Sequence, residues 1–259
     1  MRVELPMNTI RDTWLVFRRY LGLSLKNPAW VLIGILQPLL YLLLFGPLLK
    51  SVAAVPGFPR GGAYNVFVPG LLIMNGLFGS AYVGFGLIAD LRAGVIERFR
   101  VTPVSRLALL LGRAIRDVLA LLVQCLILVL LAIPFGLHIY VAGLLVVLAL
   151  LALTGLLASS ASYGVALWLK SEDALAPLLT SVTLPLLLLS GVMLPLSLAP
   201  QWLRDIALAN PVAYAVDASR AIFNDHLADI SVVKGVAIMA GLAVISVAWA
   251  ARSFGRAVA

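Results

Sequence analysis

The chain has 259 residues, of which 63% are apolar and 12% charged, and its formal net charge is +8 at pH 7. A water-soluble domain is about half apolar and about a quarter charged, so this composition excludes an ordinary soluble protein and indicates one that lies mostly in lipid. The basic residues are not interleaved with aromatic side chains on a polar surface, so we expect no nucleic-acid partner. The single cysteine, Cys125, and two isolated histidines predict no metal site.

The first 29 residues predict a cytoplasmic interface segment that contains an amphipathic helix from Asn8 to Lys26. Its apolar side chains recur at helical spacing, and its basic side chains lie on a neighbouring face. Such a helix would lie along the inner leaflet of a membrane. The alternative is a plain cytoplasmic flank that only follows the positive-inside rule. The apolar stripe is Ile10, Trp14, Phe17, Leu21 and Leu25, and the basic residues are Arg11, Arg18, Arg19 and Lys26.

Residues 30–259 predict an all-α transmembrane domain with six spans. A helical crossing needs about 20 apolar residues. The uncharged run of 52 residues from Val118 to Leu169 would be about 78 Å long as one helix, so it must turn back, and Pro134–His138 supplies the turn. The predicted spans are Trp30–Leu49, Val66–Ile88, Leu111–Ile133, Ile139–Leu169, one within Ala174–Leu203, and Val232–Ala251.

The distribution of basic residues predicts the orientation in the membrane. With the N-terminus inside, 14 of the 19 Lys and Arg residues lie in inner segments and five in outer ones. The positive-inside rule therefore places both termini in the cytoplasm, and we expect a bacterial inner membrane. A cleaved signal peptide ending near Ser51-Val52-Ala53 is the alternative for the first run. However, 29 residues precede that run, and it is longer than the usual apolar core of about 7–15 residues.

The loop between the second and third spans predicts a short cytoplasmic helix over residues 90–102. Leu91, Val95 and Phe99 recur every four residues and face one way, while charged side chains occupy the other faces. Pro103 suits the first position of the next helix, after Thr102 as its cap. This chemistry favours docking to another protein on the cytoplasmic side. The alternative is a loop that is basic only because of the positive-inside rule.

The segment after the fifth span predicts two short helices, half inserted from the outer side, over residues 197–230. Residues 194–200 break the preceding helix with two prolines, and Asn210-Pro211 interrupts the mildly apolar stretch that follows. Backbone groups freed at such breaks must be buried in protein or face water. Trp202 suits an interfacial anchor, and Asp217 and Arg220 are spaced to form an ion pair. An ordinary surface loop is the alternative.

Small and polar residues within the spans predict close helix contacts. Gly76, Ser80 and Gly84 repeat every four residues in the second span, where they allow another helix to approach. Asn75 and Tyr82 share an adjacent face. Such groups could line a pathway, but they more often bond neighbouring helices or their own backbone. The fifth span adds Thr180 and Thr183 to these uncharged polar groups.

The sequence shows neither an ion-coupling site nor an ATPase site, so we expect any energy that this protein uses to come from outside the chain. The span centres carry no charged residue, whereas ion-coupled carriers usually keep carboxylates or histidines there. The sequence also lacks the glycine-rich phosphate loop and has no Gly-Lys pair, so it is not its own ATPase. We find no catalytic motif and expect no cofactor on this chain.

Two stretches of the chain resemble the ABC type-2 exporter permeases, and within them the daunorubicin-resistance-like drug permeases. The first runs from Gly94 to Arg106 (Gly-Val-Ile-Glu-Arg-Phe-Arg-Val-Thr-Pro-Val-Ser-Arg), and the second begins at Ser190-Gly191-Val192-Met193-Leu194-Pro195. The likeness covers nearly the whole chain in order. Further matching residues are Leu111-Gly112-Arg113 and Asp117 after the first stretch, and Pro200, Trp202-Leu203, Asn210-Pro211, Asp217 and Arg220 after the second.

The resemblance implies a pair of six-helix subunits, in a homodimer or heterodimer, each resting on a cytoplasmic ATP-binding subunit that holds ATP and Mg. It implies that the loop after the second span is a coupling helix, that the N-terminal helix also touches the ATPase, that the half-inserted helices gate the outer side, and that spans two and five frame the pathway and face the partner. The implied coupling residues are Arg92, Glu97, Arg98, Phe99, Arg100 and Thr102 with Arg11, Arg18 and Arg19; the gate residues are Pro195, Trp202, Asn210, Pro211, Asp217 and Arg220; the pathway or interface residues are Asn75, Gly76, Ser80, Tyr82, Gly84, Thr180 and Thr183.

We therefore expect a membrane-spanning permease subunit that exports a hydrophobic or amphipathic substrate, drug-like or lipid-like, with ATP hydrolysis in a separate subunit. The alternative is an uncoupled six-helix module, either a carrier or an assembly factor for the cell envelope.

Overall fold

The computed structural model describes residues 6–27, 29–52, 62–96, 104–193 and 195–257. All regular secondary structure within these ranges is helical, which confirms the predicted all-α class. The elements are α1 (Pro6–Lys26), α2 (Ala29–Val52), α3 (Ala63–Ala81), α4 (Gly84–Arg92), α6 (Arg106–Ala132), η1 (Ile133–Phe135), α7 (Val141–Leu169), α8 (Glu172–Leu188), η2 (Leu196–Leu198), α9 (Gln201–Ala207), α10 (Pro211–Phe223) and α11 (Ile230–Ala257).

Among the residues that the structure describes, four helical segments are long and apolar enough to cross a membrane. They are Ala63–Arg92, Arg106–Phe135, Val141–Leu169 and Ile230–Gly255, with 26 to 30 residues each. At 1.5 Å per residue they are about 39–45 Å long, and a bilayer core is about 30 Å thick. The helix α2 contributes a shorter apolar stretch, Leu32–Leu48, and α8 has 17 residues. The total of six spans therefore stays a prediction.

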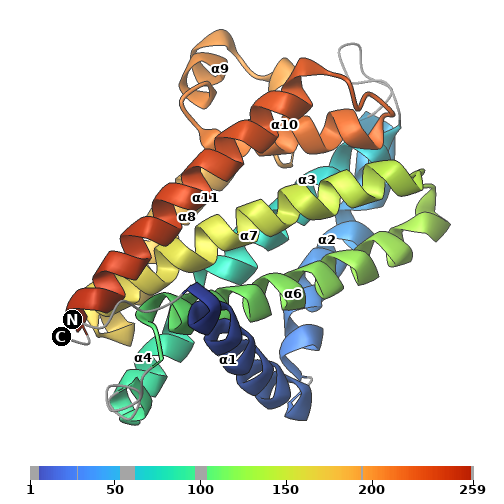
Figure 1. The fold of residues 1–259 in the computed structure, drawn as a ribbon. Helices are drawn as coiled ribbons and strands as arrows, with labels where there is room; N and C mark the ends of the chain where they lie inside the picture. The colour runs from blue at the N-terminus through green and yellow to red at the C-terminus, as the bar shows by residue number, and fades with distance from the viewer. Residues whose placement is uncertain (1–5, 28, 53–61, 97–103, 194, 258–259) are drawn as a thin grey trace.

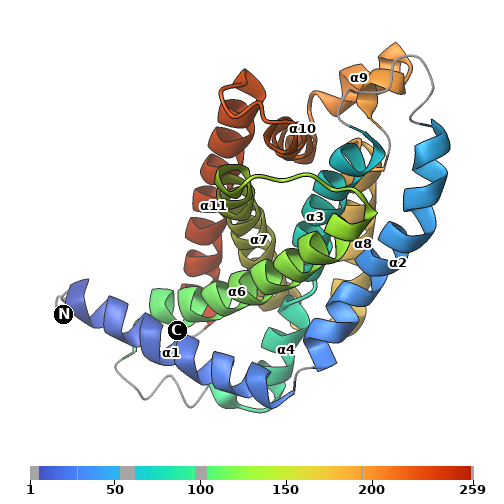
Figure 2. The ribbon, with the colours of Figure 1, turned by 90° about the vertical axis from the view of Figure 1, so that its right-hand side faces the viewer.

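The bundle has two distinct ends, which Figures 1 and 2 show from two sides. The helix α7 is central and packs against α11, α3, α6 and α8. The helices α1 and α4 lie at one end, and α9 and α10 lie at the other. The last turns of α11 return to the α1 end, where Arg106 Nη1 donates a hydrogen bond of 2.8 Å to the Gly255 carbonyl. We call these the α1/α4 end and the α9/α10 end.

The predicted turn within the long uncharged run is confirmed. The helix α6 passes into the 3-10 turn η1, and Gly136 follows with φ of 101°, a left-handed conformation that favours glycine. The chain then reverses into α7, beside α6. Two antiparallel helices of about 30 residues replace one helix that no bilayer could hold.

The second predicted span is not one continuous helix. Residues Tyr82 and Val83 interrupt it between α3 and α4. The cause lies in another helix: Ser162 of α7 donates a hydrogen bond to the Ala81 carbonyl, and its Oγ accepts one of 3.0 Å from the Gly84 amide. These bonds satisfy backbone groups that the break would leave unpaired. A Cβ at Gly84 would lie 2.9 Å from the Ser162 carbonyl oxygen, so a residue without a side chain is required here.

Two further boundaries differ from the prediction. The helix α8 ends at Leu188, some residues before the predicted break at residues 194–200, and the chain then turns through Gly191 with φ of 72°. The short helix expected over residues 90–102 is interrupted, since α4 ends at Arg92 and Gly94 takes φ of 67°. The chain is helical again at residues 95–96, and residues 97–103 lie outside the part that the structure describes.

Candidate coupling site

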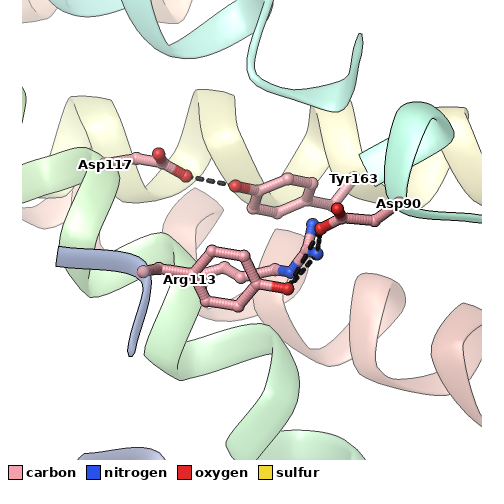
Figure 3. Close-up of polar contacts among 5 residues, drawn as sticks. Asp90, Arg113, Asp117 and Tyr163 are labelled. Carbon is pink, nitrogen blue, oxygen red and sulfur yellow. Dashed lines mark hydrogen bonds and ion pairs between the residues drawn. The ribbon is translucent and has the colours of Figure 1, made fainter. Parts of the chain in front are cut away.

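A cluster of charged and phenolic side chains joins three helices at the α1/α4 end. Arg113 of α6 forms an ion pair with Asp90 of α4 and donates a hydrogen bond to the hydroxyl of Tyr20 on α1. The Tyr20 hydroxyl in turn donates to Asp90 Oδ2 at 3.0 Å. The Arg113 guanidinium also lies 4.3 Å from the centroid of the Tyr20 ring, within cation–π range. Figure 3 shows Arg113 and Asp90 facing each other. One arginine thus contacts both helices that lie at this end.

The close packing of α1 on α6 puts Tyr20 in place. A Cβ at Gly112 would lie 2.7 Å from the Val16 side chain and 2.9 Å from the Thr13 carbonyl oxygen, so the two helices touch at this glycine. Val16 and Tyr20 then pack around Leu109. Ser105 caps the start of α6, accepting a hydrogen bond of 3.2 Å from the Ala108 amide. The helix α1 is therefore fixed along the first two turns of α6.

A second pair of contacts continues the cluster one turn further along α6. The Tyr163 hydroxyl of α7 donates a hydrogen bond to Asp117 Oδ2, and Figure 3 shows these two side chains pointing toward each other. Arg116 pairs with the other oxygen of Asp117 at 2.9 Å. The Asp117 side chain is only 2% exposed, and that of Arg113 is 4% exposed. Burying charges is costly unless each has a partner, and here two arginines and two aspartates balance each other.

The predicted coupling residues lie at the same end of the bundle where they are described. Arg92 ends α4 and pairs with Glu172, the first residue of α8, at 3.0 Å. Arg18 and Arg19 are exposed on α1. The helix α1 buries Val16, Phe17 and Tyr20 rather than the whole predicted apolar stripe, and Ile10, Trp14 and Leu25 remain exposed. Glu97, Arg98, Phe99, Arg100 and Thr102 lie outside the described residues.

The predicted gate residues lie at the α9/α10 end. Asn210, Pro211 and Arg220 hold the backbone there in place. Asn210 caps α10, accepting a hydrogen bond of 3.0 Å from the Val212 amide, and donates one of 2.6 Å to the Leu186 carbonyl at the end of α8. Pro211 occupies the first turn of α10, where a missing amide costs nothing. Pro195 is buried, whereas Trp202 is 64% exposed.

Arg220 does not make the predicted ion pair with Asp217. Its Nε donates a hydrogen bond of 3.0 Å to the Val66 carbonyl, and its Nη2 donates bonds of 2.6 Å and 3.3 Å to the carbonyls of Gly191 and Val192. Asp217 is exposed, and the ion pairs within the described residues do not include it. Arg220 therefore holds three segments together through backbone oxygens.

A depression of about 560 Å³, with both apolar and polar lining residues, opens at the same end. Asn65 of α3 lies in its wall, donating hydrogen bonds to the carbonyls of His138 (3.2 Å) and Phe223 (3.0 Å) and accepting one of 3.1 Å from the His138 amide. The Tyr140 hydroxyl donates to the Ile222 carbonyl at 3.1 Å. Desolvation and the nearby Asp225 carboxylate raise the pKa of Tyr140, so its hydroxyl stays protonated at neutral pH. These contacts pair the side chains of Asn65 and Tyr140 with backbone groups of the neighbouring segments.

Most of the predicted pathway or interface residues pack against, or form hydrogen bonds with, other residues of the same chain. A Cβ at Gly76 would lie 3.6 Å from Leu151 and Thr154 of α7, so the small-residue stripe faces α7. Asn75 is buried and donates to the Gln124 side chain at 3.4 Å. Thr183 is buried, as are Ser80 and Gly84. The exception is an exposed contact between Tyr82 and Thr180, whose hydroxyls lie 3.0 Å apart.

Aromatic rings extend this exposed contact along α3 and α4. The Tyr82 ring stacks between Phe78 and Phe85, with centroid separations of 6.3 Å and 6.0 Å and interplanar angles of 11° in both cases. All three rings are partly exposed. We call Phe78, Tyr82, Phe85 and Thr180 the aromatic strip.

The Tyr20, Asp90 and Arg113 contacts were not expected from the sequence. In the sequence, Arg113 and Asp117 stood out only as residues that match the family. The available signal was the spacing of Arg113, Arg116 and Asp117 at the start of an otherwise apolar helix, because ionisable groups in such helices usually have a partner. The sequence did not indicate which residues bind Arg113, since Tyr20 is 93 residues away along the chain.

Comparison with known proteins decides the family. The family described as ABC-2 type transporter matches residues 11–224, which is most of the chain. The chain belongs to the ABC-2 type transporters. This ABC-2 permease is 30% identical over 207 residues to the ycf38 protein of Pyropia yezoensis, whose name describes a transport permease, covering 77% of this chain and 69% of that protein.

Two other relatives support the same family. The ycf38 protein of Cyanophora paradoxa is 27% identical over 217 residues, covering 83% of the ABC-2 permease and 75% of the relative. The daunorubicin resistance ABC transporter permease protein DrrB1 of Streptomyces coeruleorubidus is 27% identical over 207 residues, covering 76% and 69%. Together with its apolar helices, the family makes this chain a multi-pass membrane protein and a transport permease subunit.

Proposed function

We propose that this ABC-2 permease exports a hydrophobic or amphipathic substrate, driven by ATP hydrolysis in a separate cytoplasmic subunit. The observation that carries the proposal is the arrangement of the α1/α4 end. The helices α1 and α4 lie there together, and buried contacts join both of them to α6, which is long enough to cross a membrane. A partner that pushes on this end would act directly on a spanning helix. The named role of DrrB1 in daunorubicin resistance supports a drug-like substrate, and lipid-like substrates share the same chemistry.

The proposed assembly contains two permease chains and two ATP-binding subunits in a bacterial inner membrane. Each permease has six spans, with both termini in the cytoplasm. The exposed side chains Ile10, Trp14 and Leu25 of α1 face the inner leaflet, while Arg18 and Arg19 on the same helix face the ATPase or lipid headgroups. The helices α9 and α10 enter the bilayer halfway and close the outer side.

A second permease chain, most simply another copy, packs against the aromatic strip. Interfaces favour aromatic side chains, because these bury a large area and lose little conformational entropy. In this arrangement the strip also borders the substrate pathway between the two chains. ATP and Mg bind the partner subunit and not this chain.

The decisive experiment uses the chain together with a candidate partner, chosen as a phosphate-loop ATPase whose gene adjoins the gene of the permease. The two proteins are coexpressed, purified through a tag on the permease and reconstituted in proteoliposomes. We expect the ATPase to copurify and ATP to drive accumulation of a fluorescent hydrophobic drug or lipid. The control is an ATPase variant whose phosphate-loop lysine is replaced. A lone chain that moves solute without any ATPase would overturn the proposal and favour an uncoupled carrier.

The coupling loop is tested by the double variant Glu97→Ala/Arg100→Ala. We expect it to insert normally and to hydrolyse ATP through its partner while export falls. Undiminished export in the double variant would remove the coupling role from this loop.

A further inference from the structure

We propose that Arg113 is a positioning residue that locks α4 to α1, so that both helices transmit the partner's movement to α6 as one body. The inference rests on the proposed function for its use, but the lock itself is a matter of contacts within this chain. The contacts of Arg113 support the proposed function, and the further step is the role of this one residue in holding the two helices together.

The contacts of α4 show why a lock is needed. The main neighbours of α4 are α7 and α8, whereas the main neighbour of α1 is α6. The two helices at this end therefore belong to different parts of the bundle. Asp90 and Tyr20 connect them directly through a hydrogen bond of 3.0 Å, and Arg113 binds both of these residues. Movement of α4 without α1 would have to break these contacts.

The chemistry of the three groups makes the lock strong. The Arg113 side chain is 4% exposed, so water cannot replace a lost partner. A guanidinium has several donors in a fixed plane, which lets one residue bind a carboxylate and a phenol at once. The Tyr20 ring lies under the guanidinium at 4.3 Å, adding a contact that is independent of its hydroxyl. Separating α4 from α1 would leave a buried charge unpaired, which is costly.

The same cluster connects α6 to α7, so a movement of α6 would be passed on to α7. Asp117 lies four residues after Arg113, one turn along α6, and binds Tyr163 of the central helix α7. Displacement of Arg113 therefore acts on a helix whose next turn is tied to α7. Packed helices with two discrete arrangements are the usual carriers of such coupling.

The lock is tested by measuring the distance between α1 and α4. Spin labels are placed at Leu15→Cys on α1 and Ala89→Cys on α4, both at exposed positions, while Cys125 is buried and stays unlabelled. We expect one narrow distance distribution in the parent chain. It should stay narrow when the complex with the ATPase is trapped with nucleotide. In Arg113→Met the distribution should broaden or split. An unchanged distribution in Arg113→Met, in the same complex, would overturn the lock.

Transport measurements separate positioning from mere structural support. In Arg113→Met we expect ATP hydrolysis to continue while the ratio of export to hydrolysis falls at least about fivefold, the lower end of typical coupling between sites. Arg252→Gln is the matched control, because it removes an exposed charge near the end of α11 and leaves the cluster intact. An unchanged ratio in Arg113→Met would overturn the proposal.

Two further variants keep the test decisive if Arg113→Met fails to fold. Tyr20→Phe removes only the hydroxyl and keeps the ring under the guanidinium, so we expect a smaller fall in the ratio. The pair Asp90→Asn/Arg113→Met removes both charges and should insert better than Arg113→Met alone, because no buried charge is left unpaired. Distances that remain narrow in both variants would count against the lock. Failure of every version, parent included, to bind an ATPase would instead overturn the proposed function, while the distances in the isolated chain would still decide the lock.

Discussion

Arg220 of α10 reaches the backbone of α3, where its Nε donates a hydrogen bond of 3.0 Å to the Val66 carbonyl. The same guanidinium binds the Gly191 and Val192 carbonyls in the turn after α8. We expect Arg220→Met to lower the free energy of unfolding by at least about 1–3 kcal/mol, the usual cost of an unsatisfied buried acceptor. Thermal unfolding of the chain in nanodiscs measures the change. Arg204→Met is the control, because Arg204 is exposed on α9, and equal effects of the two variants would contradict the role of Arg220.

The turn after α8 also approaches α3 at Gly70. A Cβ at this position would lie 2.4 Å from the Val192 carbonyl oxygen, closer than any real contact. We expect Gly70→Ala to force the turn away from α3 and to lower the free energy of unfolding by about 1–3 kcal/mol, as overpacking usually does. Gly241→Ala is the matched control, since its Cβ would meet nothing within 4 Å. Comparable unfolding temperatures for the two alanine variants would refute the close approach.

The break between α3 and α4 depends on Ser162. Ser162→Ala should leave the Ala81 carbonyl and the Gly84 amide without their present partners. We expect faster hydrogen–deuterium exchange at Gly84 and a loss of about 1–3 kcal/mol in stability, the usual cost of an unsatisfied buried group. Ser253→Ala is the control, because that hydroxyl donates to the Trp249 carbonyl of its own helix. Exchange at Gly84 that does not change in Ser162→Ala would show that the break persists without this serine.

The aromatic strip predicts the contact surface between two permease chains. We expect Thr180→Cys chains to form a disulfide-linked dimer in native membranes, because position 180 is exposed beside the Tyr82 ring. Ile245→Cys on α11 is the control, at another exposed position that is 65% accessible. Non-reducing gel electrophoresis distinguishes the two. A dimer formed only by Ile245→Cys would move the interface to α11.

Local sequence signals predicted those parts of the fold that local chemistry determines. The turn at Pro134–His138 and the break at Asn210-Pro211 follow from residues that cannot continue a helix, and both are present. The break at Tyr82-Val83 could not be predicted in this way, because Ser162 stabilises it from a helix about 80 residues away in sequence.

The candidate site shows the same limit. The charge pattern predicted that Arg18, Arg19 and Arg92 lie on one side of the membrane, and the structure brings these three to one end of the bundle. The pattern did not indicate that Arg113 turns inward to Asp90 and Tyr20. The sequence suggested instead that Arg220 pairs with Asp217, three residues away. Helical spacing permits such a pair, but the carbonyls that Arg220 binds belong to α3 and to the turn after α8. The residues next to Arg113 and Arg220 in the sequence do not indicate such contacts with distant segments.

The three hydrogen bonds of Asn65 have a mechanical consequence. They fasten the beginning of α3 to the α6–α7 turn and to the end of α10, all at the α9/α10 end. The other tip of α3, about 28 Å away along its 19 residues, is fastened to α7 by the hydrogen bond from Ser162 to the Ala81 carbonyl. Because α3 is held at both tips, a displacement of the α9/α10 end would be carried along α3 to Ser162 and to the neighbouring Tyr82 of the aromatic strip.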